Sequence, residues 1–559
     1  MPTCAKCQSQ FEITQSDLSF YSKLSVPPPT SCPDCRWIRR LLERNTRTLY
    51  KRKCDFSGEE IISQYHENHP FPVYHWKVWW SDKWDATKYA RPFDFNKPFF
   101  PQFHDLKNVT PHLSAFVIGE TMTNSLYTNC AGYLKNCYMT FEADYDEDCY
   151  YSNRLYHSQN CMDCLSIYKS ELCYEAIDCQ NCYNLKYSSD CETCSESYFL
   201  NNCKSCKNCI GCINLRHKQY YIFNKEYSKR DYEKQLAEFD FQTLANIAKF
   251  RKQAEEFFIA EPHKNLQQEH NENSLGDYLY DSKNAEYCFD CKDLEDCKYV
   301  GRVAMQAKNC MDYSGWGDKA ELLYECAACG NNAYNLKFCT TCTTNNSNLE
   351  YCDHCTGCKD CFGCVGLKRK KFCILNQEYS EEEYKDLRAR IIAHMQKNEY
   401  GQFFPIEICP FAYNESLVME VFPKTKEEAL KQGFKWLESD AKFIPQTYKM
   451  PERIADVSDS IMNELLACKS CGKNFKLIDQ ELKFYRALNV PAPIDCPNCR
   501  HFSRLATRNP KQLFESKCDK CDKKIMTSYP QNSAQDSFIH PPIYCEECYT
   551  KHVFGSNKI

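Results

Sequence analysis

The segment "CPDCRWIRRLLERN" at positions 32–45 returns near the other end of the chain as "CPNCRHFSRLATRN" at 496–509. The likeness continues on both sides of the segment, because residues 4–57 align with 468–521 without a gap. The matched positions include cysteines, aromatic residues, prolines and arginines. A small module has therefore been duplicated, with one copy at each end of the chain.

Paired CxxC motifs in each copy predict a closed site for a structural metal ion. Four thiolates from two such motifs can surround Zn²⁺ tetrahedrally and leave no open coordination position. A third set of two CxxC motifs follows the second copy. The alternative is a redox CxxC pair, but that motif is single and occurs in a βαβ context. The sequence thus predicts about three structural Zn²⁺ sites, with the ligand sets Cys4, Cys7, Cys32 and Cys35; Cys468, Cys471, Cys496 and Cys499; and Cys518, Cys521, Cys545 and Cys548.

The first copy has a damaged counterpart of the third set. Cys54 aligns with Cys518, but the other three ligand positions hold Ser57, His75 and Val78. We expect a degenerate finger that has lost its metal ion.

Two features near this finger leave alternatives open. His66 or His69 could complete a metal site with Cys54. The aromatic segment 79–100 could replace a metal cross-link by apolar packing, or it could stack on bases or dock a partner.

The composition bounds the class of protein. The chain has 559 residues, 42 cysteines and a net charge of −5, so no global positive field indicates a nucleic-acid binder. We see no signal peptide and no apolar run long enough to span a membrane. We therefore expect a cytoplasmic protein in which paired cysteines hold metal rather than form disulfides.

The middle of the chain contains two related cysteine-rich blocks, 130–212 and 288–373, which hold 14 cysteines each. Residues 211–234 pair with 363–386, and "NCMD" occurs at 160–163 and again at 309–312. Within the blocks, many cysteines recur at nearly regular intervals, with short β-favouring pieces between polar turns. This pattern favours a narrow β-solenoid. The alternative is an irregular string of small metal knuckles. The regular spacing is clearest at Cys137, Cys149, Cys161 and Cys173.

A helix closes each block. "SKRD" at 228–231 and "SEEE" at 380–383 place a serine at the N-cap and an acid three residues later, as a capping box requires. We expect these helices to cover the open ends of the two blocks.

The closely spaced block cysteines have no single assignment. They could bind further zinc ions, hold an Fe–S cluster, or form inward-facing ladders of reduced thiols. The ferredoxin-type ending that an Fe–S cluster would favour is missing. The candidate ligands are Cys203, Cys206, Cys209, Cys212, Cys352, Cys355, Cys358, Cys361 and Cys364.

A stripe of arginines follows the second CxxC motif of each copy. If that motif opens a helix, the apolar side chains point inward and the arginines lie on another stripe. Arginines kept in register suggest contact with phosphates, as in RNA, or paired carboxylates within the same fold. The candidates for nucleic-acid contact are Arg36, Arg40, Arg44, Arg500, Arg504 and Arg508.

Several motifs carry a resemblance to a known family. These are the "FYxxLxVPxPxxCPxCRxxxRLxxRN" ribbon, "FLNNCKSCKNCIGCINLRHKQYYIFNKEYS", "EYGQFFPIEICPFAYNES" and the terminal "YCEECY". The chain resembles, over nearly its whole length, a family of large uncharacterised bacterial Cys-rich proteins with several zinc ribbons. The resemblance implies metal binding but no activity, and the chain departs from it at Ser57, His75 and Val78.

No catalytic signature is present: the chain lacks the P-loop, Rossmann, nucleophile-elbow, HExxH and zinc-deaminase patterns. We therefore expect a non-enzymatic zinc-binding scaffold or adaptor that contacts RNA or a ribonucleoprotein. The alternative is a metal-storage or thiol-redox protein that uses the block cysteines. A protein partner is a further option, and the sequence does not predict an oligomeric state.

The expected fold is mainly β with small α+β modules: treble-clef or zinc-ribbon fingers at both ends flank a Cys-rich, β-solenoid-like core in two repeated blocks, each closed by a helix. The expected segments are a Cys4 finger at 1–53, a degenerate finger with the aromatic segment at 54–123, block 1 at 124–226, a helix and linker at 227–276, block 2 at 277–379, a helix at 380–400, a connecting region at 401–466, the duplicate finger at 467–517 and a zinc ribbon at 518–559.

Overall fold

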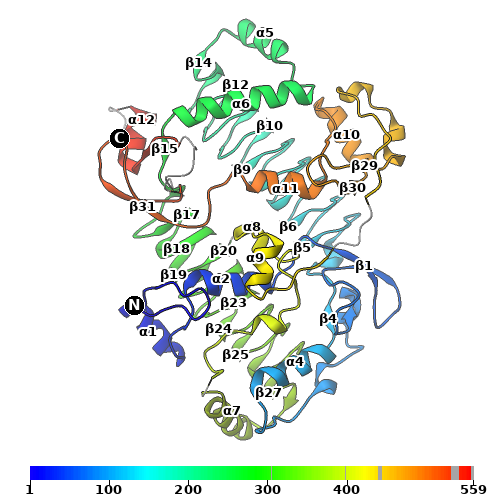
Figure 1. Cartoon of the computed structure of the whole chain (residues 1–559), viewed down its shortest axis with the longest axis vertical. Coiled ribbons are helices and arrows are strands. Elements are labelled where there is room, and N and C mark those ends of the chain that lie inside the picture. The colour runs from blue at the N-terminus through cyan, green and yellow to red at the C-terminus, as the bar shows by residue number, and fades with distance from the viewer. Residues whose placement is uncertain (304, 397, 439–442, 531–539, 556–559) are drawn as a thin grey trace. The chain divides into compact units, whose positions relative to one another are not determined.

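A computed structural model describes residues 1–303, 305–396, 398–438, 443–530 and 540–555 (Figure 1). The fold is mixed and strand-rich, with many small sheets and a cysteine cluster near each end of the chain. The chain forms two units that are both discontinuous in sequence. Unit 1 comprises Met1–Phe116 and Leu266–Leu437, and unit 2 comprises Val117–Asn265 and Glu438–Ile559. The N-terminal module thus belongs with the second block, and the C-terminal module with the first.

The first block forms a parallel stack of short strands in unit 2. Each strand pairs with a strand one repeat later in the chain at a constant offset, as in Asn129↔Phe141 and Asn153↔Leu165. The strands make two five-stranded sheets, in which only the last pair is antiparallel. They are β5 (Asn129–Gly132), β6 (Phe141–Asp144), β7 (Asn153–Tyr156), β8 (Leu165–Tyr168) and β9 (Ile177–Gln180), then β10 (Tyr183–Lys186), β11 (Ser195–Tyr198), β12 (Lys207–Ile210), β13 (Gln219–Ile222) and β14 (Lys225–Glu226).

The second block forms the corresponding stack in unit 1. Many of its strands pair at the same offset, as in Leu349↔Cys361, while others pair one position longer, as in Tyr313↔Cys326, or one position shorter, as in Gln268↔Leu279. An eight-stranded sheet precedes a five-stranded one. The strands are β16 (Gln268–Glu269), β17 (Leu275–Tyr280), β18 (Lys283–Lys292), β19 (Leu294–Lys298), β20 (Gly301–Val303), β21 (Ala307–Lys308), β22 (Tyr313–Gly317) and β23 (Cys326–Gly330), then β24 (Tyr334–Lys337), β25 (Ser347–Glu350), β26 (Lys359–Phe362), β27 (Lys371–Ile374) and β28 (Gln377–Glu378).

A left-handed residue at every third position turns the chain within each repeat of the first stack. Tyr145, Asp148, Tyr151 and Arg154 have φ of 62°, 53°, 52° and 60°. Such a conformation costs roughly 1–2 kcal/mol for a residue other than glycine. Hydrogen bonds between repeats offset this cost: Tyr150 donates its N–H to the Cys161 carbonyl at 2.9 Å, and Asp163 donates to the Tyr150 carbonyl at 3.1 Å.

Cysteine side chains fill the interior of both stacks. All block cysteines except Cys130 are buried. Their thiols donate to backbone carbonyls, as Cys161 does to Gln159 at 3.1 Å and to Ser170 at 3.6 Å. A thiol is small enough for this narrow interior and can still donate a weak hydrogen bond. The geometry corresponds to the ladders of reduced thiols that the sequence left open.

Helices flank the stacks, as expected from their capping signals. In α7 (Glu381–Met395), the Ser380 capping box is complete and Tyr384, Ile391 and Met395 are buried. The segment after the first block forms two helices, α5 (Lys229–Phe239) and α6 (Leu244–Ala260), where the sequence suggested one. At α5, Ser228 accepts from the Asp231 N–H. Among the described helices, none is long and apolar enough to cross a membrane.

The duplicated modules fold alike. In each, Cys32 or Cys496 is the N-cap of a helix that has proline at its first position, so the second CxxC motif does open a helix. The first module contains α1 (Gln15–Leu24), α2 (Pro33–Leu42), β1 (Tyr50–Lys53), β2 (Glu60–Ser63), β3 (Val73–Tyr74) and α3 (Trp76–Trp79), and the second contains α10 (Asp479–Leu488), α11 (Pro497–Leu505), β31 (Phe514–Lys517), β32 (Lys524–Thr527), β33 (Ile543–Tyr544) and α12 (Glu546–Phe554).

The remaining elements are short, apart from α4. In unit 1 they are η1 (Ala86–Tyr89), α4 (Phe99–Val109), β4 (His112–Leu113), η3 (Ile406–Ile408), α8 (Val418–Val421) and α9 (Lys426–Lys431); in unit 2 they are η2 (Gly119–Thr121), β15 (His263–Lys264), η4 (Ile454–Asp456), η5 (Asp459–Asn463), β29 (Leu466–Ala467) and β30 (Asn474–Phe475).

The sealed thiols lead to a labelling prediction. Burial raises the pKa of Cys161 well above its usual value, and the thiolate is the form that alkylating reagents attack. Because the block thiols other than Cys130 are buried, brief treatment of the native protein with N-ethylmaleimide should leave them unmodified, with half-buried Cys130 as the exception. Peptide mass spectrometry measures the labelling, and denaturation before treatment is the control that exposes every site. Labelling of Cys161 in the native chain would contradict the packing.

Candidate metal centres and the duplicated arginine cluster

Each of the three predicted Cys4 sets is brought together. The four sulfurs of a set all lie within 4.8 Å of one another, a separation that one metal ion can bridge. In the first set the Cys32 N–H donates to Cys4 Sγ at 3.2 Å, and in the third the Cys545 N–H donates to Cys518 Sγ at 3.2 Å. These N–H groups stabilise thiolates. Burial opposes ionisation of Cys518, yet the backbone N–H groups of Cys545 and Lys520 lower its pKa to about 6.

The damaged finger keeps its backbone but not its ligands. The His75 N–H donates to Cys54 Sγ at 3.3 Å, which matches the bond from Cys545 to Cys518 in the intact finger. Yet Cys54 belongs to no group of three or more metal-ligating side chains among the residues described.

Aromatic packing surrounds the damaged finger. Trp79 and Phe99 from the aromatic segment are buried, which favours apolar packing over base stacking for that segment. The rings of His66 and His69 lie against Tyr50 and Phe71, at centroid distances of 5.1 Å in both pairs. The two histidines therefore act as part of this packing.

The arginines of the first copy converge on one buried carboxylate. Arg36 Nε lies 2.8 Å from Asp312 Oδ2, and Arg40 Nη1 lies 3.0 Å from Asp312 Oδ1. Asp312 is fully buried and comes from the second block. Arg39 adds a further pair with Glu325 at 2.6 Å.

The second copy repeats the arrangement with the other block. Arg500 Nε and Arg504 Nη1 lie 3.2 and 2.8 Å from Asp163 Oδ1. Asp163 and Asp312 are the last residues of the two "NCMD" motifs. A tyrosine one repeat earlier also matches: Arg36 lies over the Tyr299 ring at 5.4 Å, and Arg500 lies over Tyr151 at 4.8 Å. We call each group of two arginines, one aspartate and one tyrosine an arginine clamp.

The third arginine of each stripe differs between the copies. Arg508 Nε pairs with Asp178 Oδ2 at 2.8 Å, and its side chain is 6% exposed. Arg44 is buried against Gly315, where a Cβ atom would collide with its guanidinium.

The clamp carboxylates keep the buried arginines charged. Burial alone would lower the pKa of Arg36 and of Arg500, but Asp312 and Asp163 outweigh it, and both pKa values are raised. For Arg40 burial prevails, and its pKa is lowered from its usual value. An arginine remains protonated at neutral pH even so.

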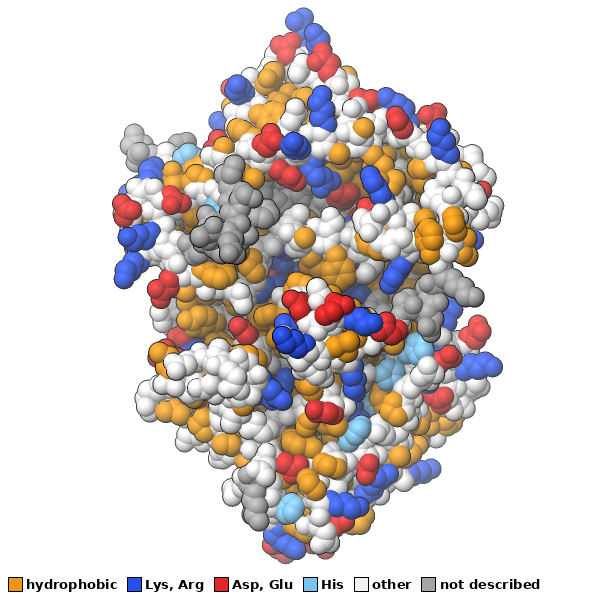
Figure 2. Space-filling model, viewed as in Figure 1, with side chains coloured by type: hydrophobic (Ala, Val, Ile, Leu, Met, Phe, Trp, Pro, Cys, Tyr) orange, Lys and Arg blue, Asp and Glu red, His pale blue; other side chains and the backbone are white. Residues whose placement is uncertain are grey.

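The six arginines are therefore placed for internal bracing, which the sequence left open beside nucleic-acid contact. Their side chains are at most 9% exposed and face carboxylates or backbone of the same unit. The sequence pattern set the arginine stripe apart from the buried face of the helix; in the structure that stripe is itself buried. On the face seen in Figure 2, basic and acidic side chains are interspersed rather than separated into fields of one sign.

No block cysteine in the described part of the chain belongs to a group of three or more ligand atoms that all lie within 4.8 Å of one another. Among the described residues, the groups with at least three ligand atoms within 4.8 Å of one another are the three Cys4 sets and one group of His112, Asp353 and His354. That last group was not predicted from the sequence, and neither were the roles of Asp163 and Asp312. The acid that ends both "NCMD" motifs was the available signal for the clamps.

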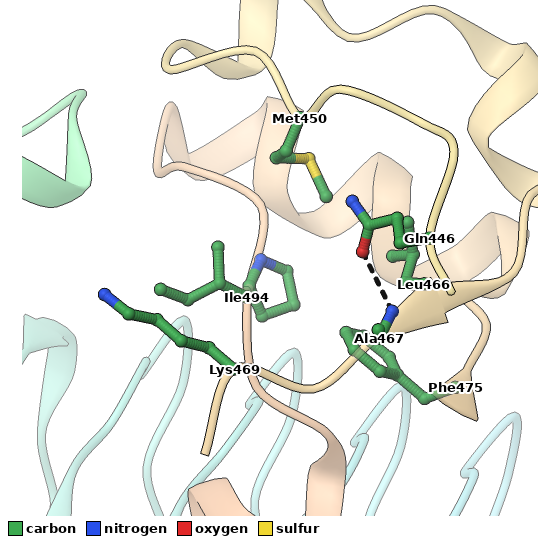
Figure 3. A pocket seen from close by; sticks show the side chains of 8 residues that line it. Gln446, Met450, Leu466, Ala467, Lys469, Phe475 and Ile494 are labelled. Atoms are coloured by element: carbon green, nitrogen blue, oxygen red, sulfur yellow. Dashed lines mark hydrogen bonds between the residues drawn. The ribbon is translucent and has the colours of Figure 1, made fainter. Parts of the chain in front are cut away.

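A pocket of about 350 Å³ lies beside the second Cys4 set in unit 2 (Figure 3). Among the described residues that line it, the charged one is Lys469, which stands between Cys468 and Cys471. Gln446 Oε1 accepts from the Ala467 N–H at 2.8 Å, so its polar group is already bonded. The pocket offers no acid–base pair, and it supports no catalytic assignment. It is lined by Gln446, Met450, Leu466, Ala467, Lys469, Phe475, Pro493 and Ile494.

Comparison with models of known protein families found no match, and comparison with curated proteins found no significant match. The function must therefore be argued from the geometry of the chain itself.

The clamps lead to a stability prediction. Removing Asp163 leaves Arg504 without the carboxylate that faces it and Arg500 with Glu481 alone, so Asp163→Ala should lower the free energy of unfolding by about 3–5 kcal/mol. Asp312→Ala should do the same in unit 1. Denaturant titration gives the loss, and hydrogen exchange over α11 or α2 locates it.

The control for the clamp prediction is Glu147→Gln. This substitution breaks an exposed pair with Lys135, whose side chain is 57% exposed. It should cost no more than about 1 kcal/mol. A cost for Asp163→Ala as small as that of the control would show that the clamps contribute little.

Proposed function

We propose that the chain is a non-enzymatic, zinc-stabilised scaffold. The three Cys4 sets, each with its sulfurs within 4.8 Å of one another, carry this proposal. A closed tetrathiolate site stabilises a fold and has no free position for a substrate. Zinc is the metal that such a ligand set favours in a reducing compartment. The fingers, which we assign as treble-clef or ribbon modules, then provide rigid caps.

We further propose that the two parallel stacks are narrow β-solenoids. Pairing at a nearly constant offset from one strand to the next supports this interpretation, as does the left-handed residue at every third position. Stacked repeats of this kind bury a continuous core and present long side surfaces for binding. The duplicated architectural unit is then a finger pair clamped to a solenoid. The proposed segment boundaries stay as the sequence predicted them, but the two units do not follow them: unit 1 takes 1–116 with 266–437, and unit 2 takes 117–265 with 438–559.

A metal-storage or thiol-redox function has less support. The block thiols are sealed from solvent and donate to backbone carbonyls, as Cys352 does to Glu350 at 3.4 Å. Metal exchange or disulfide chemistry would need access for an ion, an oxidant or a partner thiol. For a single metal ion, no three of the described block cysteines have sulfurs that all lie within 4.8 Å of one another.

Contact with RNA or a ribonucleoprotein stays a prediction. The arginine clamps no longer motivate it, because phosphate contact would require the buried guanidiniums to leave their carboxylates. Any such contact would have to use other side chains on the surface of the stacks or fingers.

Metal analysis tests the proposal. Purified protein should contain tightly bound zinc in the Cys4 sets, and Cys471→Ser should lose about one zinc ion per chain because three thiolates cannot close the site. Cys54→Ser is the control, since Cys54 aligns with Cys518 of the third set but stands in the finger whose other three ligand positions have changed. It should leave the zinc content unchanged. Equal zinc content in Cys471→Ser and the wild type, or iron with visible absorption, would refute the proposal.

A further inference from the structure

Three metal-ligating side chains lie together in the interior of unit 1, without a cysteine among them. His112 is in β4, and Asp353 and His354 come from the stack between β25 and β26. One ring nitrogen of each histidine and one carboxylate oxygen of Asp353 all lie within 4.8 Å of one another. His112, Asp353 and His354 are 0%, 1% and 4% exposed.

Unit 2 contains a matched histidine that shows what is unusual about His112. His112 pairs with β3 and His263 pairs with β33, and each donates its N–H at 2.8 Å to a proline carbonyl. The Nε2 atom of each lies close to the carbonyl five residues earlier, at 3.2 Å from Lys107 and 2.9 Å from Phe258. A carbonyl can only accept, so both Nε2 atoms carry the proton. Each Nδ1 atom then carries no proton and can accept a hydrogen bond.

The two Nδ1 atoms have different surroundings. His263 Nδ1 lies 3.0 Å from the hydroxyl of Tyr529, which donates to it. Tyr65 is the counterpart of Tyr529, since each follows its hairpin strand by two residues. The Tyr65 hydroxyl instead faces His354 Nε2 at 3.4 Å. His112 Nδ1 is consequently a buried acceptor with no hydrogen-bond partner among the described residues.

The residues that face the Tyr65 hydroxyl differ from those at the equivalent place in unit 2. Asp353 pairs with Val365 in the same way that Asn201 pairs with Ile213, and the two blocks align at these positions. Asp353 and His354 thus replace Asn201 and Asn202 of the other stack. A neutral pair has become an acid and an imidazole, next to a histidine that lacks a partner.

The surrounding groups orient these side chains as they do around metal ions. A histidine ligand usually donates its other ring N–H to a carbonyl or carboxylate, and ligating carboxylates have hydrogen-bond partners of their own. His112 has the Lys107 carbonyl, His354 Nδ1 lies 2.6 Å from Asp353 Oδ1, and Lys107 Nζ lies 3.1 Å from Asp353 Oδ2.

We propose that His112, Asp353 and His354 form a fourth metal site, which takes a divalent transition-metal ion of the zinc type through nitrogen and oxygen rather than sulfur. The site lies in the unit whose second finger has lost its thiolates. It needs no thiolate, so it is independent of the three Cys4 sites.

The test uses the full chain loaded with zinc. Two residues of the proposed site are replaced by the residues that unit 2 has at the aligned positions. The double variant Asp353→Asn with His354→Asn installs the pair that the other stack carries at this position, so the stack should still fold. His263→Gln is the matched control in unit 2. Wild-type protein should contain about one zinc ion more than the double variant, and His263→Gln should match the wild type. Equal zinc content in wild type and double variant would overturn the proposal.

X-ray absorption at the zinc edge gives a second measurement that depends on no variant. Thiolate ligands scatter at about 2.3 Å from zinc, and nitrogen or oxygen ligands at about 2.0–2.1 Å. The wild type should show both shells. A sulfur shell alone would overturn the fourth site and leave the Cys4 sites intact, whereas a nitrogen and oxygen shell alone would refute the Cys4 sites and support the fourth.

Discussion

The structure depends on a buried carboxylate that serves two guanidiniums in each unit. Asp312 holds Arg36 and Arg40, and Asp163 holds Arg500 and Arg504. Each clamp fixes a finger helix against the side of a stack. It sets both the repeat that the helix contacts and the orientation of the helix about its own axis. Two charges that share a partner in a dry interior tolerate little displacement, because any shift leaves one of them without compensation. The clamps therefore specify where a finger sits more than they add net stability.

The copies differ in the contacts that accompany the clamp. Arg39 reaches Glu325 in unit 1, and the aligned residue in the other copy is Ser503. Arg508 reaches Asp178 in unit 2, and its counterpart Arg44 packs on Gly315 instead. Exchanging the fingers between stacks would leave Glu325 buried without this partner, because Ser503 would stand in the place of Arg39. Charge thus distinguishes two otherwise similar pairings, which is how a duplicated chain can avoid assembling its halves in the wrong combination.

Local sequence patterns predicted most of the local structure. The CxxC spacing predicted all three sulfur clusters, and "SEEE" predicted the capped start of α7. The pairing of each finger with the more distant block had no local signal, since Arg36 and Asp312 are far apart in the chain. Helical periodicity placed the arginines on one stripe but left their partners open, because it sorts side chains by hydropathy and cannot show that a buried carboxylate faces that stripe. The sequence did not predict the group of His112 and His354 for the same reason: the two residues are far apart in the chain, and no local motif links them.

Comparison of the units suggests how a finger can lose its metal and keep its shape. Around Cys54, the backbone bond from His75 persists although three ligand positions have changed. The lost cross-link is offset by apolar packing of Trp79 and Trp84 and by the buried polar group of Lys107, Asp353 and His354. Unit 2 keeps thiolates in its finger and asparagines in its stack. The two changes in unit 1 adjoin one another, because β3 of the damaged finger pairs with β4, which carries His112. The altered finger and the candidate set of His112, Asp353 and His354 are therefore neighbours within one part of unit 1.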